Sequence, residues 1–303
     1  MEQKIKYAIK AARANFLPAS LMPFLIGAFY AFRLGHNVSP ARFILAFLGV
    51  GSMHLAGNLF NDYFDYKSGA DNMSGKESPF FGGSRVIQKG LLNSSDVLSL
   101  SLFFTALAFL CGMGIYIITE DPVFPLFMLI AAILAFEYTA PPLRLSYNRL
   151  GELDIFLLFG VLLVMGSFYL FTGTFTIGAF LVSLPISFLV GAIIVCNEVP
   201  DYHSDVAAGK HNLVYIVGRE RGYIIYAFLI ILSALTLIVN VLSGNIPHIS
   251  ALIILFYAIG VKVTLILKDR VSGMNDFIHA SMLTIALHTI VGAAMILTLL
   301  VKL

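Results

Sequence analysis

Charged residues are scarce in this chain of 303 residues, and so are cysteines. Aspartate, glutamate, lysine and arginine make up 12% of the sequence, whereas 59% is hydrophobic and the mean hydropathy is +0.90. A soluble domain carries about 25% charged residues, so the composition excludes an ordinary soluble domain and predicts an integral membrane protein. Both cysteines, Cys111 and Cys196, lie in apolar stretches and predict neither a disulfide framework nor a cysteine metal site.

Apolar stretches long enough to cross a bilayer recur along the whole chain. A helix needs about 20 residues to span the hydrocarbon core, and the sequence predicts an all-α membrane protein with nine such helices. Their expected bounds are residues 15–35, 42–64, 96–119, 122–140, 153–173, 175–199, 222–243, 248–267 and 277–301. We expect residues 1–303 to form one transmembrane domain, with a first half over 15–140 and a second half over 153–303.

The lysines and arginines lie mainly on one side of these expected spans. If the N-terminus is cytoplasmic, every one of them falls in a cytoplasmic segment except Arg33, Arg42, Lys302 and the intramembrane Lys262. Cytoplasmic loops of membrane proteins carry such an excess. The distribution therefore predicts a multi-pass protein of the cell membrane with a cytoplasmic N-terminus. We expect no nucleic-acid partner and no obligate protein partner.

Two acidic patterns stand at the ends of the second and sixth expected spans. The first reads Asn61-Asp62-Tyr63-Phe64-Asp65 and is followed by Asp71, and the second reads Asn197-Glu198-Val199-Pro200-Asp201 and is followed by Asp205. One charge at the centre of a membrane helix costs roughly 2.5 to 3.5 kcal/mol. Two clusters of carboxylates beside hydrocarbon therefore indicate a function.

The separation of the two motifs bears on the fold. Because they end helices four spans apart, they share one orientation. This predicts a parallel duplication, helices 1–4 and 5–8 plus a ninth helix, with both motifs on the cytoplasmic face. Inverted repeats, which are common in secondary transporters, would place the motifs on opposite sides.

Both motifs place oxygen ligands on a common helix face. Asn61 and Asp65 are four residues apart, and Asn197, Asp201 and Asp205 have the same spacing if their helix continues past its proline. Facing carboxylates repel each other unless a cation lies between them. Oxygen-only ligands favour Mg²⁺, which commonly shares its coordination shell with phosphate oxygens.

Further polar residues surround the motifs. His54 and Asn58 extend the stripe of the first motif, either as a polar seam that leads to the site or as interhelical hydrogen-bonding groups. Basic residues follow the motifs at Lys67, Lys76, Arg85, Lys89, Arg144 and Lys210. They suggest a diphosphate head at the interface and a lipid tail inside, although the positive-inside bias alone explains some of them. Lys262 and His288 match no motif and have no assigned role.

The motifs resemble those of a known family. Residues 61–71 and 197–210 are similar to the two Asp-rich motifs of the UbiA superfamily of intramembrane prenyltransferases, and nine helices is that family's number. Residues 138–144, leading to 150–152, are similar to the segment after the family's fourth helix. The interval from Asp65 to Asp71 and the Ser84-Arg85-Val86 triplet resemble the menaquinone branch, which prenylates 1,4-dihydroxy-2-naphthoate, and its vitamin K-synthesising relatives.

The resemblance implies a Mg²⁺-dependent enzyme that moves an isoprenyl group from a polyprenyl diphosphate to an aromatic quinone precursor, through an allylic carbocation and with release of diphosphate. The implied metal ligands are Asn61, Asp65, Asp71, Asn197, Asp201 and Asp205, with Asp62 a weaker candidate. The implied diphosphate-binding residues are Asn61, Lys67, Arg85, Arg144, Asn197 and Lys210. The implied catalytic residues are Asp65, Asp201, Arg85, Arg144 and Tyr138.

Other functions stay open at this point. The acceptor could instead be a glycerol-phosphate lipid, and CDP-alcohol phosphotransferases and cation transporters also use acidic clusters in membranes. The CDP-alcohol signature that begins Asp-Gly-x2-Ala-Arg is absent from the sequence, and the parallel repeat argues against a transporter. The prenyl chain length, the acceptor and the oligomeric state are not determined by the sequence.

Overall fold

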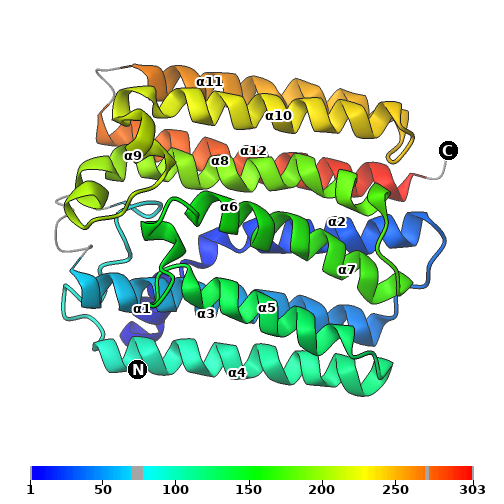
Figure 1. The fold of residues 1–303 in the computed structure, drawn as a ribbon, viewed down its shortest axis with the longest axis horizontal. Coiled ribbons are helices and arrows are strands. Elements are labelled where there is room, and N and C mark those ends of the chain that lie inside the picture. The colour runs from blue at the N-terminus through cyan, green and yellow to red at the C-terminus, as the bar shows by residue number, and fades with distance from the viewer. Residues whose placement is uncertain (1, 70–77, 270–272, 302–303) are drawn as a thin grey trace.

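The computed structural model describes residues 2–69, 78–269 and 273–301. Over these ranges the named elements are all helices, and the long ones run side by side along the long axis of the molecule (Figure 1). Eight helical segments are long and apolar enough to cross a membrane. The protein is therefore an all-α, multi-pass membrane protein, as its composition predicted.

Eight of the nine expected spans have a counterpart of spanning length. They are η1 (Ala14–Phe16) with α2 (Pro18–Arg33), α3 (Pro40–Ser68), α4 (Ser94–Thr119), the continuous α6 (Gly151–Ile155), η4 (Phe156–Leu162) and α7 (Leu163–Thr172), α8 (Ile177–Ala207), α10 (Gly222–Leu242), η6 (His248–Tyr257) with α11 (Ala258–Lys268), and α12 (Met274–Leu300). The expected span at 122–140 corresponds to α5 (Val123–Glu137), which has 15 residues. A full crossing needs about 20, so nine full spans are not confirmed. The parallel duplication stays a prediction.

Sequence signals account for the bounds of the two motif-bearing helices. Pro40 occupies the first turn of α3, where the missing N–H has no helical partner to lose. Gly69 ends α3 with a left-handed backbone, φ 79°, which glycine adopts without strain. α8 continues through Pro200 to Ala207. The second motif is therefore helical over its whole length, as its spacing requires.

Close packing places α8 at the centre of the bundle, where it contacts α10, α12 and η4. Gly160 of η4 faces α8 so tightly that a Cβ there would lie 2.1 Å from the Oγ of Ser187. Gly27 of α2 approaches α7 in the same way, 2.3 Å from the carbonyl oxygen of Val164. Small residues permit such close helix approach in membrane bundles.

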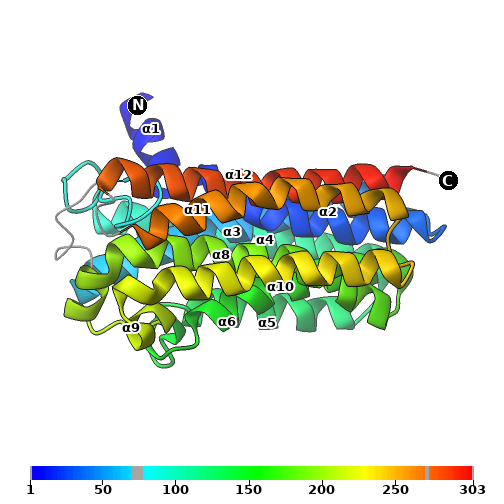
Figure 2. The ribbon, with the colours of Figure 1, turned by 90° about the horizontal axis from the view of Figure 1, so that it is seen from above.

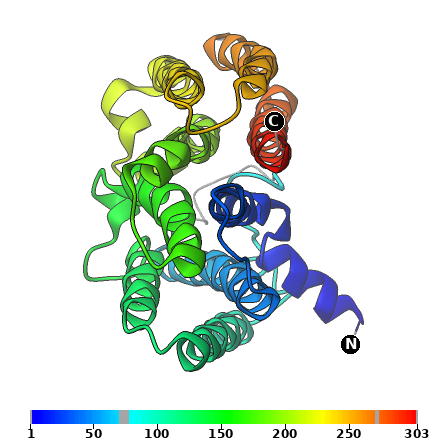
Figure 3. The same cartoon turned by 90° about the vertical axis from the view of Figure 1, so that its right-hand side faces the viewer.

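The chain runs once around the bundle in the end-on view (Figure 3). From α3–α5 it passes to α6–α8, then to α10 and α11, and α12 returns to pack against α2. Short elements gather at one end, namely α1 (Glu2–Ala11), which projects from the bundle (Figure 2), η1 (Ala14–Phe16), η3 (Leu145–Tyr147), α9 (Leu213–Val217) and η5 (Arg219–Arg221). Since α3 and α8 end there too, this end carries both acidic motifs.

Candidate active site at the acidic end of the bundle

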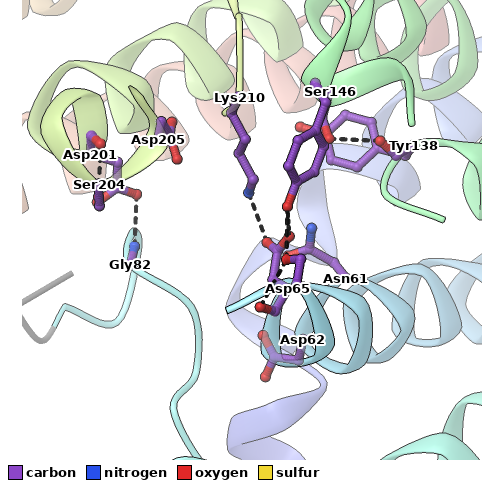
Figure 4. Close-up of polar contacts among 12 residues, drawn as sticks. Asn61, Asp62, Asp65, Gly82, Tyr138, Ser146, Asp201, Ser204, Asp205 and Lys210 are labelled. Carbon is purple, nitrogen blue, oxygen red and sulfur yellow. Dashed lines mark hydrogen bonds and ion pairs between the residues drawn. The ribbon is translucent and has the colours of Figure 1, made fainter. Parts of the chain in front are cut away.

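The ends of α3 and α8 border one pocket, which we call the acidic pocket, with an empty volume of about 1120 Å³. Its polar lining comes from both motifs and from loops, and comprises Arg13, Asn58, Asn61, Asp65, Tyr138, Ser146, Asn197, Glu198, Asp201, Ser204, Asp205, Lys210 and Asn212. The structure thus brings the two motifs into one site (Figure 4). Asp71, an expected metal ligand, lies outside the described residues.

Asp65 is the most enclosed carboxylate of the pocket, with 4% of its surface exposed. Its Oδ2 lies 2.8 Å from the Nζ of Lys210 (Figure 4), and its Oδ1 accepts a hydrogen bond of 3.1 Å from the Tyr147 hydroxyl. Lys210 follows the second motif in the sequence. The ion pair therefore ties the second half of the chain to the first motif.

Lys210 and Tyr147 lie outside the spans, and this cluster sets their protonation. Burial disfavours the Lys210 ammonium, but the carboxylates of Asp65 and Asp205 outweigh burial, so the pKa of Lys210 is raised well above that of a free lysine. Burial and the nearby Asp65 also raise the pKa of Tyr147. Both side chains stay protonated at neutral pH and act as donors to Asp65.

Asp62 belongs to the first motif but does not line the acidic pocket. It is 2% exposed and forms an ion pair of 2.6 Å with the Nη2 of Arg13. It also accepts hydrogen bonds from the hydroxyl and the N–H of Ser84. Asp62 therefore fastens the N-terminal segment and the loop after the first motif to α3, and its weaker candidacy as a metal ligand stays a prediction.

The carboxylates of the second motif have neutral partners. Asp201 accepts a hydrogen bond of 2.8 Å from the N–H of Gly82 (Figure 4), and Asp205 accepts one of 3.1 Å from the Nδ2 of Asn212. The Oδ1 of Asn197 accepts one of 2.8 Å from the Ser281 hydroxyl on α12. Within the described part of the chain, neither Asp201 nor Asp205 forms an ion pair within 4.0 Å.

The predicted basic residues separate into two groups. Lys210 lines the pocket, and Arg85 lies near enough to Asp201 to interact with it electrostatically. Arg144 instead stacks on the ring of Tyr147, 3.8 Å from its centroid, and Lys67 is exposed beside Tyr63. Neither Arg144 nor Lys67 is among the described residues that line the acidic pocket.

Tyr138 reaches the pocket from the end of α5. Its carbonyl oxygen accepts hydrogen bonds from the Oγ and the N–H of Ser146, at 2.7 and 2.9 Å, which fixes its backbone (Figure 4). Burial, and after it the carboxyl group of Glu198, raise the pKa of Tyr138 well above its ordinary value. The hydroxyl therefore stays protonated, and Tyr138 lines the pocket, while its catalytic role stays a prediction.

Sequence reasoning missed several residues of the site. Arg13, Tyr147 and Asn212 all contact motif carboxylates or border the pocket. Arg13 appeared only as part of the basic N-terminal run, and Asn212 matched no motif. Tyr147 lies in the segment between Arg144 and Leu150. Its position in that segment was the one signal in the sequence that could have identified it as a site residue.

A second, apolar cavity adjoins the acidic pocket. We call it the apolar chamber; its empty volume is about 1040 Å³, and its walls come from α2, α3, α4, α5, η4 and α7. Ala135, Leu158 and Phe159 line both cavities. The arrangement suits an amphiphile whose charged head lies among the acidic and basic groups and whose tail lies in the chamber.

The oxygen-rich lining also bears on a metal ion. Carboxylate and amide oxygens of Asn61, Asp65, Asn197, Asp201 and Asp205 share the pocket, and these are ligands that Mg²⁺ prefers. Among the described residues, however, no three acidic, histidine or cysteine side chains group as a ready metal site. The donor set fits Mg²⁺ bound by one or two carboxylates and completed by diphosphate oxygens.

The fold and the site thus define a membrane protein with a polar head-group pocket next to an apolar chamber. A profile of the UbiA prenyltransferase family matches residues 20–296. The chain belongs to the UbiA prenyltransferase family. This confirms the resemblance inferred from the two motifs, and it makes the chain a member of a family of enzymes.

Curated relatives agree with this assignment. The chain is 29% identical over 236 residues to UbiA prenyltransferase domain-containing protein 1 of Xenopus tropicalis, covering 77% of this chain and 66% of that protein. It is 30% identical over 209 residues to 1,4-dihydroxy-2-naphthoate octaprenyltransferase of Bacillus subtilis, covering 69% of this chain and 65% of that protein. The matched region thus spans about two thirds of the length of these relatives.

Solved structures share the fold. A UbiA homologue from Archaeoglobus fulgidus bound to DMAPP and Mg²⁺ superposes with a TM-score of 0.67 at 20% identity, covering 95% of this chain and 98% of that chain. The apo UbiA homologue from Aeropyrum pernix K1 superposes with a TM-score of 0.72 at 15% identity, covering 92% and 97%. These similarities support the fold of this chain.

Proposed function

We propose that this protein transfers an isoprenyl group from an isoprenyl diphosphate to an aromatic acceptor within the membrane, with Mg²⁺ bound and with release of diphosphate. One observation carries the proposal: the acidic pocket, which holds both motifs, opens beside the apolar chamber and shares three wall residues with it. The family assignment and the Mg²⁺-bound relative support the same reading.

In this proposal the acidic pocket binds the diphosphate head. Asn61, Asp65, Asn197, Asp201 and Asp205 would hold Mg²⁺, which neutralises the charge that grows on the leaving diphosphate. The predicted ligand Asp71 would join them. Lys210 and Arg85 would stabilise the diphosphate, and Arg13, which lines the pocket, is added to this group. Arg144 and Lys67 would act at most indirectly, since neither borders the pocket.

The chamber would bind the isoprenyl tail and keep water from the allylic cation. Its lining is almost entirely hydrocarbon, including Phe24, Phe124, Phe127 and Leu170. The allylic C–O bond breaks with its electron pair on the diphosphate, an electron-rich ring carbon of the acceptor forms the new C–C bond, and the ring then loses a proton. Tyr138, protonated and next to the pocket, would border the reacting carbon.

The nature of the chamber favours an aromatic acceptor over a glycerol-phosphate lipid. No lysine or arginine is among the described residues that line it, so the chamber offers no charge partner for a phosphate. The Bacillus subtilis relative is named for a naphthoate acceptor. A digeranylgeranylglyceryl phosphate synthase shares the fold, with a TM-score of 0.65 at 16% identity, which keeps a glycerol-phosphate lipid as the second candidate.

The location of the site in the cell is part of the proposal. The lysine and arginine distribution favours a cytoplasmic N-terminus. Because α1 and the acidic pocket lie at the same end of the bundle, the pocket would face the cytoplasm.

The proposal is tested with the purified full chain in lipid, geranyl diphosphate and Mg²⁺. We expect diphosphate release and a prenylated product with 1,4-dihydroxy-2-naphthoate, little product with a glycerol-phosphate lipid that carries one prenyl chain, and loss of both signals on addition of EDTA. Product on the glycerol-phosphate lipid alone would favour the second candidate. Absence of transfer to either acceptor, in protein that is folded and binds the donor, would refute a prenyltransferase.

A further inference from the structure

His54 lies at the boundary between the two cavities. Along α3, the apolar chamber is lined from Leu45 up to His54, and the acidic pocket is lined from Gly57 onward. Seven residues separate His54 from Asn61, which is about 10 Å along a helix. The imidazole therefore faces the zone where a group just beyond the diphosphate would react.

The ring of His54 is fixed through one nitrogen, and its other nitrogen is buried without a hydrogen-bond partner among the described residues. Its Nδ1 is hydrogen-bonded to the Ser20 hydroxyl at 2.6 Å, and its ring lies perpendicular to that of Phe159 at a centroid distance of 5.5 Å. The side chain is 5% exposed, and its Nε2 has no hydrogen-bond partner among the described residues. A buried polar atom without a partner is costly, so this nitrogen calls for a ligand.

This nitrogen is distinctive within the chamber. Among the described residues that line it, only Ser20, His54 and Ser167 carry hydroxyl or ring-nitrogen groups. The Ser20 hydroxyl is engaged with His54, and the Ser167 hydroxyl donates to the carbonyl oxygen of Phe24 at 2.7 Å. The Nε2 of His54 is thus the polar side-chain atom of the chamber wall that is left to meet a ligand.

We propose that His54, oriented by Ser20, binds an oxygen substituent of the aromatic acceptor and places its ring beside the isoprenyl donor. This inference rests on the proposed function and names the acceptor's site. Imidazole offers either a donor or an acceptor at Nε2 according to its tautomer, and a ring hydroxyl can do both, so the pair forms in either case. Phe159 supplies an aromatic surface against which the flat acceptor packs.

The site predicts the class of acceptor. A hydroxylated aromatic ring fits a wall with one neutral hydrogen-bonding atom and an aromatic edge. A phosphate head group would need the cations of the acidic pocket, where the donor's diphosphate binds. His54 and Ser20 are therefore positioning residues for a phenolic or naphtholic ring.

The test compares acceptor and donor in a set of His54 variants. For His54→Phe we expect the KM for 1,4-dihydroxy-2-naphthoate to rise about tenfold, the size expected when one buried hydrogen bond is lost. The Kd for geranyl diphosphate with Mg²⁺ should stay within about twofold. His54→Gln, whose amide reaches the position of Nε2, should recover part of the acceptor KM, and Ser20→Ala should raise it less than His54→Phe.

His288 provides a matched control. It is also fully buried, both its ring nitrogens lack a partner among the described residues, and it lines neither cavity. His288→Phe should leave the acceptor KM unchanged, and melting temperatures of both variants show whether folding differs. If His54→Phe leaves the acceptor KM unchanged, or weakens donor binding as much as acceptor binding, the role of His54 is wrong and the proposed function still stands. If the wild type binds geranyl diphosphate but prenylates no aromatic ring, both the role of His54 and the proposed function are wrong.

Discussion

The two acidic motifs share the Asn-acid-x-x-Asp spacing but differ in how their carboxylates are compensated. In the first motif, Asp62 is paired with Arg13 and Asp65 with Lys210. In the second, Asp201 and Asp205 accept hydrogen bonds from an N–H and an amide group, and the described residues place no cation within ion-pair distance of either. Two cations of the chain itself therefore hold the carboxylates of the first motif, whereas Asp201 and Asp205 of the second have only neutral hydrogen-bond partners among the described residues.

Contacts of the two motifs also show that the two halves of the chain depend on each other. Lys210 follows the second motif, yet it neutralises a carboxylate of the first. Gly82 follows the first motif, yet its N–H binds Asp201 of the second. Each motif is thus completed by a loop from the other half of the chain, and the acidic pocket forms only when both halves are folded.

The largest expected effect comes from removing charge from the second motif. Asp201→Asn keeps the shape of the side chain but removes a carboxylate that has no ion-pair partner within 4.0 Å among the described residues, and we expect prenyl transfer to fall at least about 100-fold, as for the loss of one electrostatic stabiliser of a leaving group. Steady-state kinetics and Mg²⁺-dependent binding of geranyl diphosphate measure the loss. Asp96→Asn, at the cap of α4, should retain activity. Full turnover by Asp201→Asn would sink the assignment of the second motif.

The largest expected effect on stability, as distinct from activity, concerns the Lys210–Asp65 ion pair. Lys210→Met leaves Asp65 buried without its cation, which costs about 3 to 5 kcal/mol when one partner of a buried pair is removed. Because the pKa of Lys210 is raised in the folded state, the pair contributes fully below the ordinary lysine pKa of about 10.4 and is lost only as the pH rises through the raised value.

Thermal melts across a pH series check this prediction. The difference in melting temperature between wild type and Lys210→Met should stay constant from about pH 7 to pH 9, well below the ordinary lysine pKa. Lys67→Met serves as the control, since Lys67 is exposed and most such surface changes shift stability by less than about 0.5 kcal/mol. A gap that closes between pH 7 and pH 9 would show that Lys210 is not held protonated by Asp65.

The smallest effect separates the two aspartates of the first motif. Asp62→Ala removes the partner of Arg13 and of Ser84, so we expect the protein to lose about 1 to 3 kcal/mol of stability. Asp62 does not line the acidic pocket but its partner Arg13 does, so kcat/KM of the remaining folded protein should fall far less than in Asp201→Asn. A loss of activity as large as that of Asp201→Asn, at unchanged stability, would show instead that Asp62 serves the site directly.

Much of the fold and the core of the site followed from local sequence. Apolar length predicted eight of the spans, because the bilayer imposes a helix length on any segment that crosses it. Helical periodicity predicted that Asn61 would share a face with Asp65, and that Asn197, Asp201 and Asp205 would share another, and all five line the acidic pocket. The family assignment then confirmed what these motifs had suggested.

Other parts of the site depend on contacts between distant segments. Asp62 is only three residues from Asp65, and helical periodicity places the two as neighbours on α3. Arg13 and Ser84 nevertheless engage Asp62, which does not line the acidic pocket. Lys67 and Lys210 both follow an acidic motif, but only the loop after α8 brings its lysine to Asp65. The spacing of residues along the chain does not predict the path that these loops take.

The sequence by itself determined the membrane class, most of the spans, the two oxygen-rich helix faces and the family, since each depends on composition or on local periodicity. Only the tertiary structure decided which carboxylates are neutralised, which basic groups reach the pocket, and where the polar site meets the apolar chamber. Those features arise where helices and loops far apart in the chain pack together, and burial there sets the cost of every unpaired charge.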